Sequence, residues 1–98
     1  MSRTDREAVL QEIRSLKPRF ERTYGVTKIG IFGSLARNEA QDDSDVDVVV
    51  EMRPDLMKRA RLKAELESSF RRKVDVVRYW RGMNTFLKKR IDDEALYV

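Results

Sequence analysis

Two neighbouring stretches decide the fold of this chain: IGIFGSLAR at residues 29–37 and SDVDVVVE at residues 44–51. Both are rich in β-branched residues, which predicts strands over residues 27–32 and 45–51. Gly33-Ser34 ends the first strand, because glycine readily adopts the conformation of a sharp turn. A short helix over residues 34–38 is expected to follow the turn.

The second strand carries acidic side chains on one face only. Side chains two positions apart on a strand share a face, so Asp45 and Asp47 should project together. The opposite face is left with apolar side chains for the core, which are Val46, Val48 and Val50. A solvated turn accounts for an acidic run such as residues 42–45. It does not account for Asp47 inside an aliphatic strand, where an unpaired carboxylate is costly if buried.

A helix is predicted to precede the first strand. Thr4 and Glu7 match a capping box that starts a helix near Asp5. Apolar residues then recur at helical spacing, namely Val9, Leu10, Ile13, Leu16 and Phe20. Pro18 should kink or divide this helix, because proline removes a backbone donor.

The remainder of the chain predicts two more helices and a third strand. Leu56 to Phe70 suits a helix, Val74 to Val77 a strand, and a final helix is expected after Gly82. The apolar face of that last helix should contain Phe86, Leu87, Ile91 and Leu96. This order of elements predicts one α/β (α+β) domain over residues 1–98, with a small mixed sheet of about three strands flanked by helices.

The composition limits the chemistry open to the chain. It has no cysteine and no histidine, which excludes disulfides, thiolate metal sites and histidine general bases. Any catalysis must therefore depend on carboxylates. The net charge of +4 favours anionic partners such as nucleotides, nucleic acid or an acidic protein surface. Signal-peptide and membrane-spanning patterns are absent from the sequence, so we expect a cytoplasmic protein without membrane contact.

The paired carboxylates predict a metal site. Asp45 and Asp47 repel each other unless a cation neutralises them, and Mg²⁺ prefers oxygen ligands, waters and substrate phosphates. Asp75 stands alone between valines on the third strand and can face the same site if the strands pair. Three carboxylates could hold two ions that activate an attacking oxygen and stabilise a leaving pyrophosphate. Gly33 and Ser34 would supply backbone and hydroxyl donors to phosphate. The pattern therefore favours nucleotidyl transfer.

Gly33-Ser34, then Asp45-x-Asp47, then a lone strand aspartate resemble the motifs of the DNA polymerase beta superfamily of nucleotidyltransferases. More narrowly, the run from Gly33-Ser34-x-Ala36-Arg37 to Ser44-Asp45-x-Asp47 resembles the minimal nucleotidyltransferases, and this similarity covers nearly the whole chain. Asn38 departs from the family, where many relatives have glycine. Asparagine tolerates a left-handed backbone better than most residues, so we expect the turn to survive.

The resemblance implies an activity, a partner and site residues. Such proteins are often antitoxins that transfer AMP from ATP to a tyrosine of a HEPN ribonuclease toxin. Catalysis and metal binding would fall to Asp45, Asp47 and Asp75, and Asp75 is also the candidate to polarise the acceptor hydroxyl. Nucleotide contacts would come from Gly33, Ser34, Arg37 and Ser44, although Arg37 could instead brace the acidic loop.

Three alternatives stay open at this point. A protein of the same fold could neutralise its toxin by binding alone. Asp43-x-Asp45-x-Asp47 also resembles the start of a calcium-binding EF-hand loop, but Val48 stands where that loop needs glycine. The basic residues 58–63 and 71–73 are either solvated helix surface or a nucleic-acid patch, which salt-dependent RNA binding would reveal.

Overall fold

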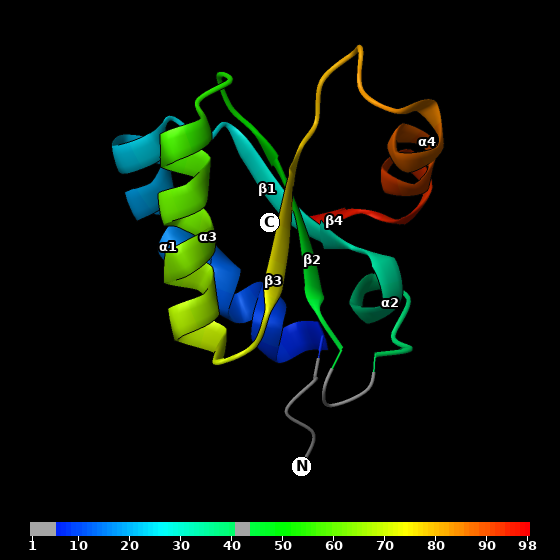
Figure 1. The fold of residues 1–98 in the computed structure, drawn as a ribbon. Coiled ribbons are helices and arrows are strands. Elements are labelled where there is room, and N and C mark those ends of the chain that lie inside the picture. The colour runs from blue at the N-terminus through cyan, green and yellow to red at the C-terminus, as the bar shows by residue number, and fades with distance from the viewer. Residues whose placement is uncertain (1–5, 41–43) are drawn as a thin grey trace.

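The structure is a computed structural model that describes residues 6–40 and 44–98. Its elements follow the predicted order (Figure 1). They are α1 (Arg6–Tyr24), β1 (Lys28–Phe32), α2 (Gly33–Ala36), β2 (Val46–Glu51), α3 (Leu56–Phe70), β3 (Val74–Arg78), α4 (Thr85–Glu94) and β4 (Leu96–Tyr97). Thr4 and Asp5 at the predicted helix start lie outside the described residues, as do Asp42 and Asp43. Within those residues, no helix is long and apolar enough to cross a membrane.

The sheet is mixed, in the order β3-β2-β1-β4. β1 pairs antiparallel with β2 and with β4, whereas β2 and β3 run parallel. The predicted mixed α/β class is confirmed, but the prediction of about three strands missed β4. Gly30 makes that pairing possible, because a β-carbon there would lie 2.9 Å from the carbonyl carbon of Leu96.

The end of α4 differs from the sequence prediction. Ala95 is extended, with ψ 139°, so the helix ends before Leu96, which pairs with Ile31 instead. The predicted helix therefore runs into the fourth strand, because backbone pairing with β1 outcompetes one more helical turn. Phe86 is also not on the packed face of α4, since it is 83% exposed.

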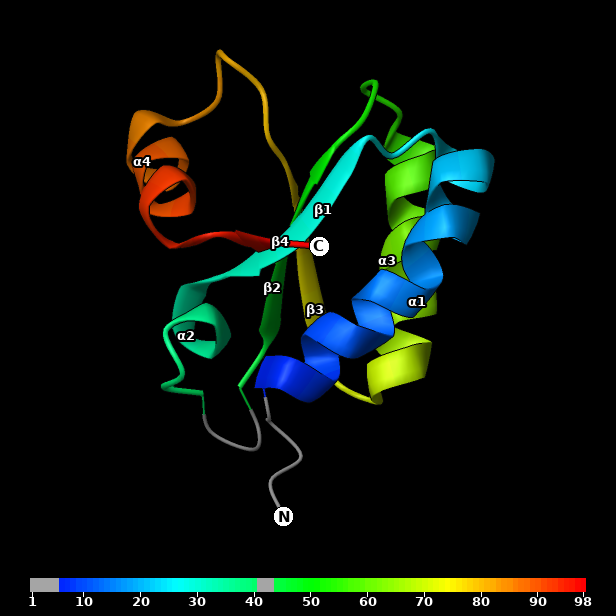
Figure 2. The same ribbon diagram turned by 180° about the vertical axis from the view of Figure 1, so that it is seen from behind.

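Two layers of helix cover the two faces of the sheet. Figures 1 and 2 show α1 and α3 on one side and α4 on the other, with α2 at the end of β1. The main core fills the space under α1 and α3 and contains Ile13, Phe20, Leu62 and the three inward valines of β2. A smaller cluster lies under α4, made of Phe32, Val49, Met83 and Ile91.

Pro18 does not divide α1, which continues from Arg6 to Tyr24. Of the two predicted outcomes, a kink or a division, the division is therefore wrong. Proline removes one backbone hydrogen bond. Residues on both sides of it are buried in the same core, with Ile13 and Phe20 both 0% exposed. The apolar face thus stabilises the helix by more than the lost bond destabilises it.

Candidate functional site

Pairing of β2 with β3 brings two of the predicted carboxylates together. Asp47 and Asp75 are register partners in this parallel pair, so their side chains leave the same face of the sheet side by side. Asp45 lies two positions before Asp47, immediately before β2, and is exposed. The inward-facing side chains of β2 behave as predicted: Val46, Val48 and Val50 are all 0% exposed.

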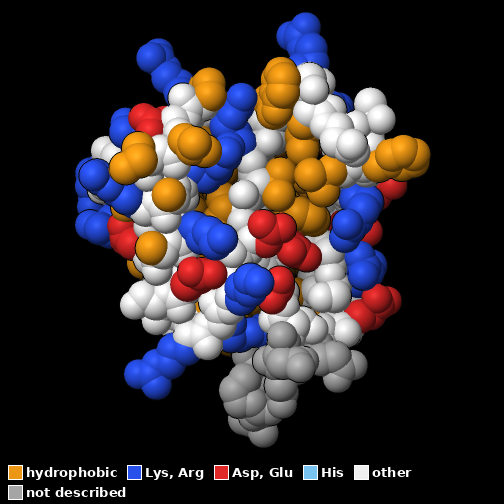
Figure 3. All heavy atoms as spheres, viewed as in Figure 1, with side chains coloured by type: hydrophobic (Ala, Val, Ile, Leu, Met, Phe, Trp, Pro, Cys, Tyr) orange, Lys and Arg blue, Asp and Glu red, His pale blue; other side chains and the backbone are white. Residues whose placement is uncertain are grey.

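Asp47 has an electrostatically costly position. Burial is the main reason that its pKa lies above the ordinary value, and the neighbouring charges of Asp75 and Asp45 raise the pKa further. Arg90 and Arg37 act in the opposite direction without reversing the shift. A carboxylate that is half-buried and surrounded by like charge is stabilised by a cation. Figure 3 shows acidic side chains gathered on this surface, beside an apolar area and flanked by lysine and arginine.

Gly33 shapes the space in front of Asp47. It is buried, with φ +77°, a conformation that L side chains rarely adopt. A β-carbon at this position would lie 3.1 Å from Cγ of Asp47 and nearer still to Oδ2. The glycine is thus needed for two reasons, the turn into α2 and the close approach of Asp47. Asn38 also adopts a positive φ of 63°, so the departure from glycine there leaves the turn intact.

Arg37 belongs to a network of ion pairs. Its Nε donates to Oε1 of Glu39 at 3.0 Å, and its Nη1 donates to Oε1 of Glu94 at 3.0 Å. The Gly33 amide donates to the same Glu94 oxygen at 3.1 Å. Arg37 therefore links Glu39, the first residue of the predicted loop, to Glu94 on α4. The predicted bracing of the acidic loop stays a prediction, because residues 41–43 lie outside the described residues. A contact with phosphate stays a prediction.

Ser34 lies in α2, and Ser44 lies two residues before β2. Ser34 is half-buried in α2, directly after Gly33, and its carbonyl accepts a hydrogen bond from the Glu39 amide at 2.8 Å. The carbonyl of Ser44 accepts a hydrogen bond from Arg72. Ser34 follows Gly33, which faces Asp47, and Ser44 directly precedes Asp45. The nucleotide contacts of both serines stay predictions.

The donor set fits Mg²⁺ without forming a closed cage. Among residues 6–40 and 44–98, no group of three or more carboxylates is already arranged to hold an ion. Mg²⁺ usually takes only one or two protein carboxylates and fills its shell with waters and substrate phosphates. The side-by-side pair of Asp47 and Asp75, with Asp45 adjoining, matches that requirement.

Glu94 and Arg90 are site residues that the sequence did not reveal. Both lie on α4, in the charged run KKRIDDE at residues 88–94. Glu94 reaches the Gly33 amide, and Arg90 lowers the pKa of Asp47. A run of mixed charge on a helix is ordinary solvated surface, so only the packing of α4 against α2 distinguishes these two residues.

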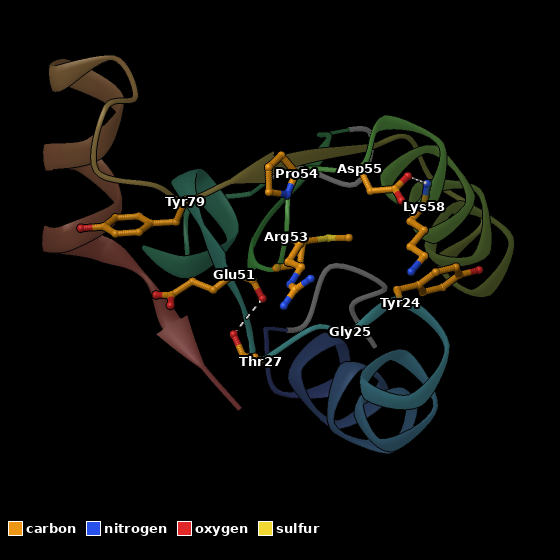
Figure 4. Close-up of a pocket in the computed structure, with 10 residues that line it drawn as sticks. Tyr24, Gly25, Thr27, Glu51, Arg53, Pro54, Asp55, Lys58 and Tyr79 are labelled. Atoms are coloured by element: carbon orange, nitrogen blue, oxygen red, sulfur yellow. Dashed lines mark hydrogen bonds between the residues drawn. The ribbon is translucent and has the colours of Figure 1, made fainter.

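A cavity of about 680 Å³ lies away from the carboxylates, where β1 begins and β2 ends (Figure 4). It is lined by Tyr24, Gly25, Thr27, Glu51, Met52, Arg53, Pro54, Asp55, Lys58 and Tyr79. Asp55 is already engaged there, because its carboxylate accepts a hydrogen bond from the Lys58 amide at 3.0 Å as the cap of α3. The predicted site residues do not line this cavity.

Comparison with known proteins identifies relatives along most of the chain. The family described as "Nucleotidyltransferase domain" matches residues 13–98. The protein adenylyltransferase MntA of Thermococcus cleftensis is 36% identical over 95 residues, which cover 91% of this chain and 95% of the relative. A Methanocaldococcus jannaschii protein provisionally named a protein adenylyltransferase is 43% identical over 77 residues, covering 76% and 82% of the two chains.

Solved structures share the fold. One that is provisionally described as a minimal nucleotidyltransferase superposes with a TM-score of 0.77 at 32% identity, covering 94% of both chains. A toxin–antitoxin MntA–HepT structure gives a TM-score of 0.66 at 22% identity and covers 93% of this chain and 69% of its own. The second likeness is one of fold alone. On the family match and the closely similar relatives, the chain belongs to the nucleotidyltransferase domain family and is a nucleotidyltransferase related to the protein adenylyltransferases.

Proposed function

We propose that this protein is a Mg²⁺-dependent antitoxin that transfers AMP from ATP to a tyrosine hydroxyl of a HEPN-type toxin. The observation that carries the proposal is the in-register pair of Asp47 and Asp75. Asp47 lies beside the Gly33 turn, and its pKa is raised because it is half-buried among like charges. Such a site favours a bound cation together with an anionic substrate.

Each predicted residue has a role in this reaction. Mg²⁺ held by Asp45, Asp47 and Asp75 would neutralise charge on the phosphates as the leaving pyrophosphate departs. Gly33 and Ser34 would hold the triphosphate, with Arg37 and Ser44 at its margins. The acceptor oxygen attacks the α-phosphorus of ATP, its proton passes toward Asp75, and the bond to pyrophosphate breaks. Positioning and charge neutralisation supply most of the rate enhancement in such a transfer.

The proposed partner is supported by relatives and by the surface of the molecule. The Thermococcus relative is named a protein adenylyltransferase, and a structural neighbour comes from a complex of a Shewanella oneidensis HEPN toxin with its antitoxin. Several large apolar side chains are exposed here, including Trp80 at 49% and Phe86 at 83%. Exposed large apolar side chains favour a protein partner over a small acceptor.

Intact mass measurement tests the proposal. The protein is co-expressed with the product of the gene beside its own, which the proposal expects to be a HEPN-type toxin, and the mass of that product is measured. We expect one or more added AMP groups with the wild-type chain, none with the Asp45→Asn/Asp47→Asn double variant, and full modification with Asp93→Asn. Asp93 is the matched control because it is an exposed carboxylate in the last turn of α4 that pairs with Lys89.

The same experiment separates catalysis from neutralisation by binding. An unmodified toxin that co-purifies with the wild type and the double variant alike would contradict the enzymatic proposal. Peptide mapping of the modified toxin then assigns the acceptor residue, and modification at a residue other than tyrosine would correct that part of the proposal.

A further inference from the structure

The Glu94 carboxylate is held by donors at the Gly33 turn. Its Oε1 accepts hydrogen bonds from the Gly33 amide at 3.1 Å and from Nη1 of Arg37 at 3.0 Å. Arg90 Nη2 lies 3.9 Å from the same oxygen. Gly33 and Arg37 are two of the groups that the proposed function assigns to the triphosphate. Oε1 of Glu94 therefore already accepts hydrogen bonds from donors that the proposed function assigns to phosphate.

The stability of α4 does not explain why an acid stands at this position. A helix C-terminus carries partial negative charge, so cations there stabilise a helix and anions destabilise it. Glu94 is nevertheless the last residue of α4. Its side chain is only 20% exposed, whereas that of Asp93 beside it is 60% exposed. The contacts of Glu94 with α2, rather than its own helix, account for this placement.

We propose that Glu94 is an internal competitor of the nucleotide triphosphate. While its carboxylate engages Gly33 and Arg37, the turn is closed to phosphate, and nucleotide binding must displace it. This inference rests on the proposed function, since it concerns the regulation of the same site. According to this inference, the contact between α2 and α4 controls nucleotide affinity and also packs the two helices together.

The size of the effect follows from the population of the engaged state. When only a fraction of molecules is competent to bind, the apparent Kd equals the intrinsic Kd divided by that fraction. A charge-assisted contact of this kind, occupied about nine-tenths of the time, would weaken binding about tenfold. Removal of the Glu94 charge should recover most of that factor.

A purely structural role predicts the opposite result. If Glu94 only caps α2 and holds it against α4, then its removal loosens the Gly33 turn and weakens nucleotide binding. Glu94→Gln keeps an oxygen that can accept from the Gly33 amide but loses the attraction to Arg37 and Arg90. Glu94→Ala removes the contact altogether. The two variants together separate charge from packing.

Calorimetric titration of the full chain with AMP-PNP and Mg²⁺ tests the inference. We expect the Kd of Glu94→Gln to be about three- to tenfold lower than that of the wild type, and Asp93→Asn to leave it unchanged. Thermal unfolding is recorded for each variant to confirm that it is folded. The tighter binding should accompany an equal or lower melting temperature, because a native contact has been removed.

The outcomes distinguish this inference from the proposed function. If the wild type binds AMP-PNP and both Glu94 variants bind it no more tightly, the proposed competition is overturned. The nucleotide site itself is then left in place. If neither the wild type nor any Glu94 variant binds AMP-PNP, the proposed function fails, and the competition is overturned with it. Equal tightening by Asp93→Asn would also overturn the inference, because the effect would then be one of net charge alone.

Discussion

The two faces of strand β2 have opposite characters. On the face toward α1 and α3, Val46, Val48 and Val50 are completely buried. On the other face, Asp47 is half-buried beside Asp75, which is exposed on the edge strand. The same six residues therefore serve stability on one side and chemistry on the other, which the alternation of side chains along a strand makes possible.

The helices that cover these faces differ in the same way. α1 and α3 close their side of the sheet over a large apolar core. On the other side, α4 covers only a small cluster, and its Phe86 remains 83% exposed. The open side thus leaves carboxylates accessible to ligand, while the closed side supplies most of the apolar burial that stabilises the domain.

The largest expected effect comes from replacing the carboxylates on the face of the sheet toward α4, which we call the open face. Replacement of Asp47 or Asp75 by Asn should lower the rate of AMP transfer by about a thousandfold or more, because charge stabilisation at a metal site contributes several kcal/mol and each 1.4 kcal/mol is about tenfold. Single-turnover transfer to the purified toxin measures this rate. A reduction below about tenfold in both variants, each folded, would contradict the assignment of the site.

Truncation of core side chains under α1 and α3, on the closed face of the sheet, should affect stability instead. Ile13→Ala and Leu62→Ala each remove a side chain that is 0% exposed, which should lower the free energy of unfolding by about 2–5 kcal/mol. Urea denaturation measures the loss. The transfer rate per folded molecule should stay near that of the wild type. Loss of rate in the folded variants would show that the two faces are coupled.

Two glycines with the same backbone conformation sharpen the comparison. Gly25 has φ +72° and open space around a β-carbon, whereas Gly33 has φ +77° and faces Asp47. Gly25→Ala should cost only backbone strain of about 1 kcal/mol. Gly33→Ala adds the collision with Asp47 and should abolish measurable nucleotide binding. Calorimetry and urea denaturation of both variants check this, and similar behaviour of the two would contradict the role given to Gly33.

The smallest effect concerns the pH dependence of stability. The pKa of Asp47 is raised on folding, mainly by burial, so the folded state holds this proton more tightly than the unfolded state. This tighter proton binding stabilises the folded state. The stabilisation is fully present below the unfolded carboxyl pKa of about 3.9 and is lost as pH rises through the folded pKa of Asp47. Without divalent cations, the wild type should therefore lose stability relative to Asp47→Asn over this window. Urea denaturation at several pH values tests the sign.

The sequence predicted most of this fold because its patterns are local. The apolar residues that predicted a helix, from Leu56 to Phe70, all lie in α3, and Asp55 caps that helix. Asp47 was recognisable because a charge in an aliphatic strand has no local explanation. The sequence placed Asp75 beside Asp47 only on the condition that their strands pair, and the parallel pairing of β2 with β3 meets that condition.

The remaining features depend on tertiary contacts that no local pattern records. Leu96 was predicted on the apolar face of the last helix, yet it pairs with Ile31 because Gly30 leaves room for its backbone. Glu94 stands among other charges of α4, and only the packing of α4 on α2 brings it to Gly33. Pro18 breaks a local rule, which the burial of the residues around it overrides.

A crystal structure of the protein with Mg²⁺ and AMP-PNP is the most direct test of the central claim, which places the chemistry on the open face of β2. The account predicts the triphosphate at Gly33 and Ser34, with metal ions on Asp45, Asp47 and Asp75. Nucleotide bound elsewhere with these carboxylates empty, for example in the cavity beside Tyr24 and Arg53, would contradict it.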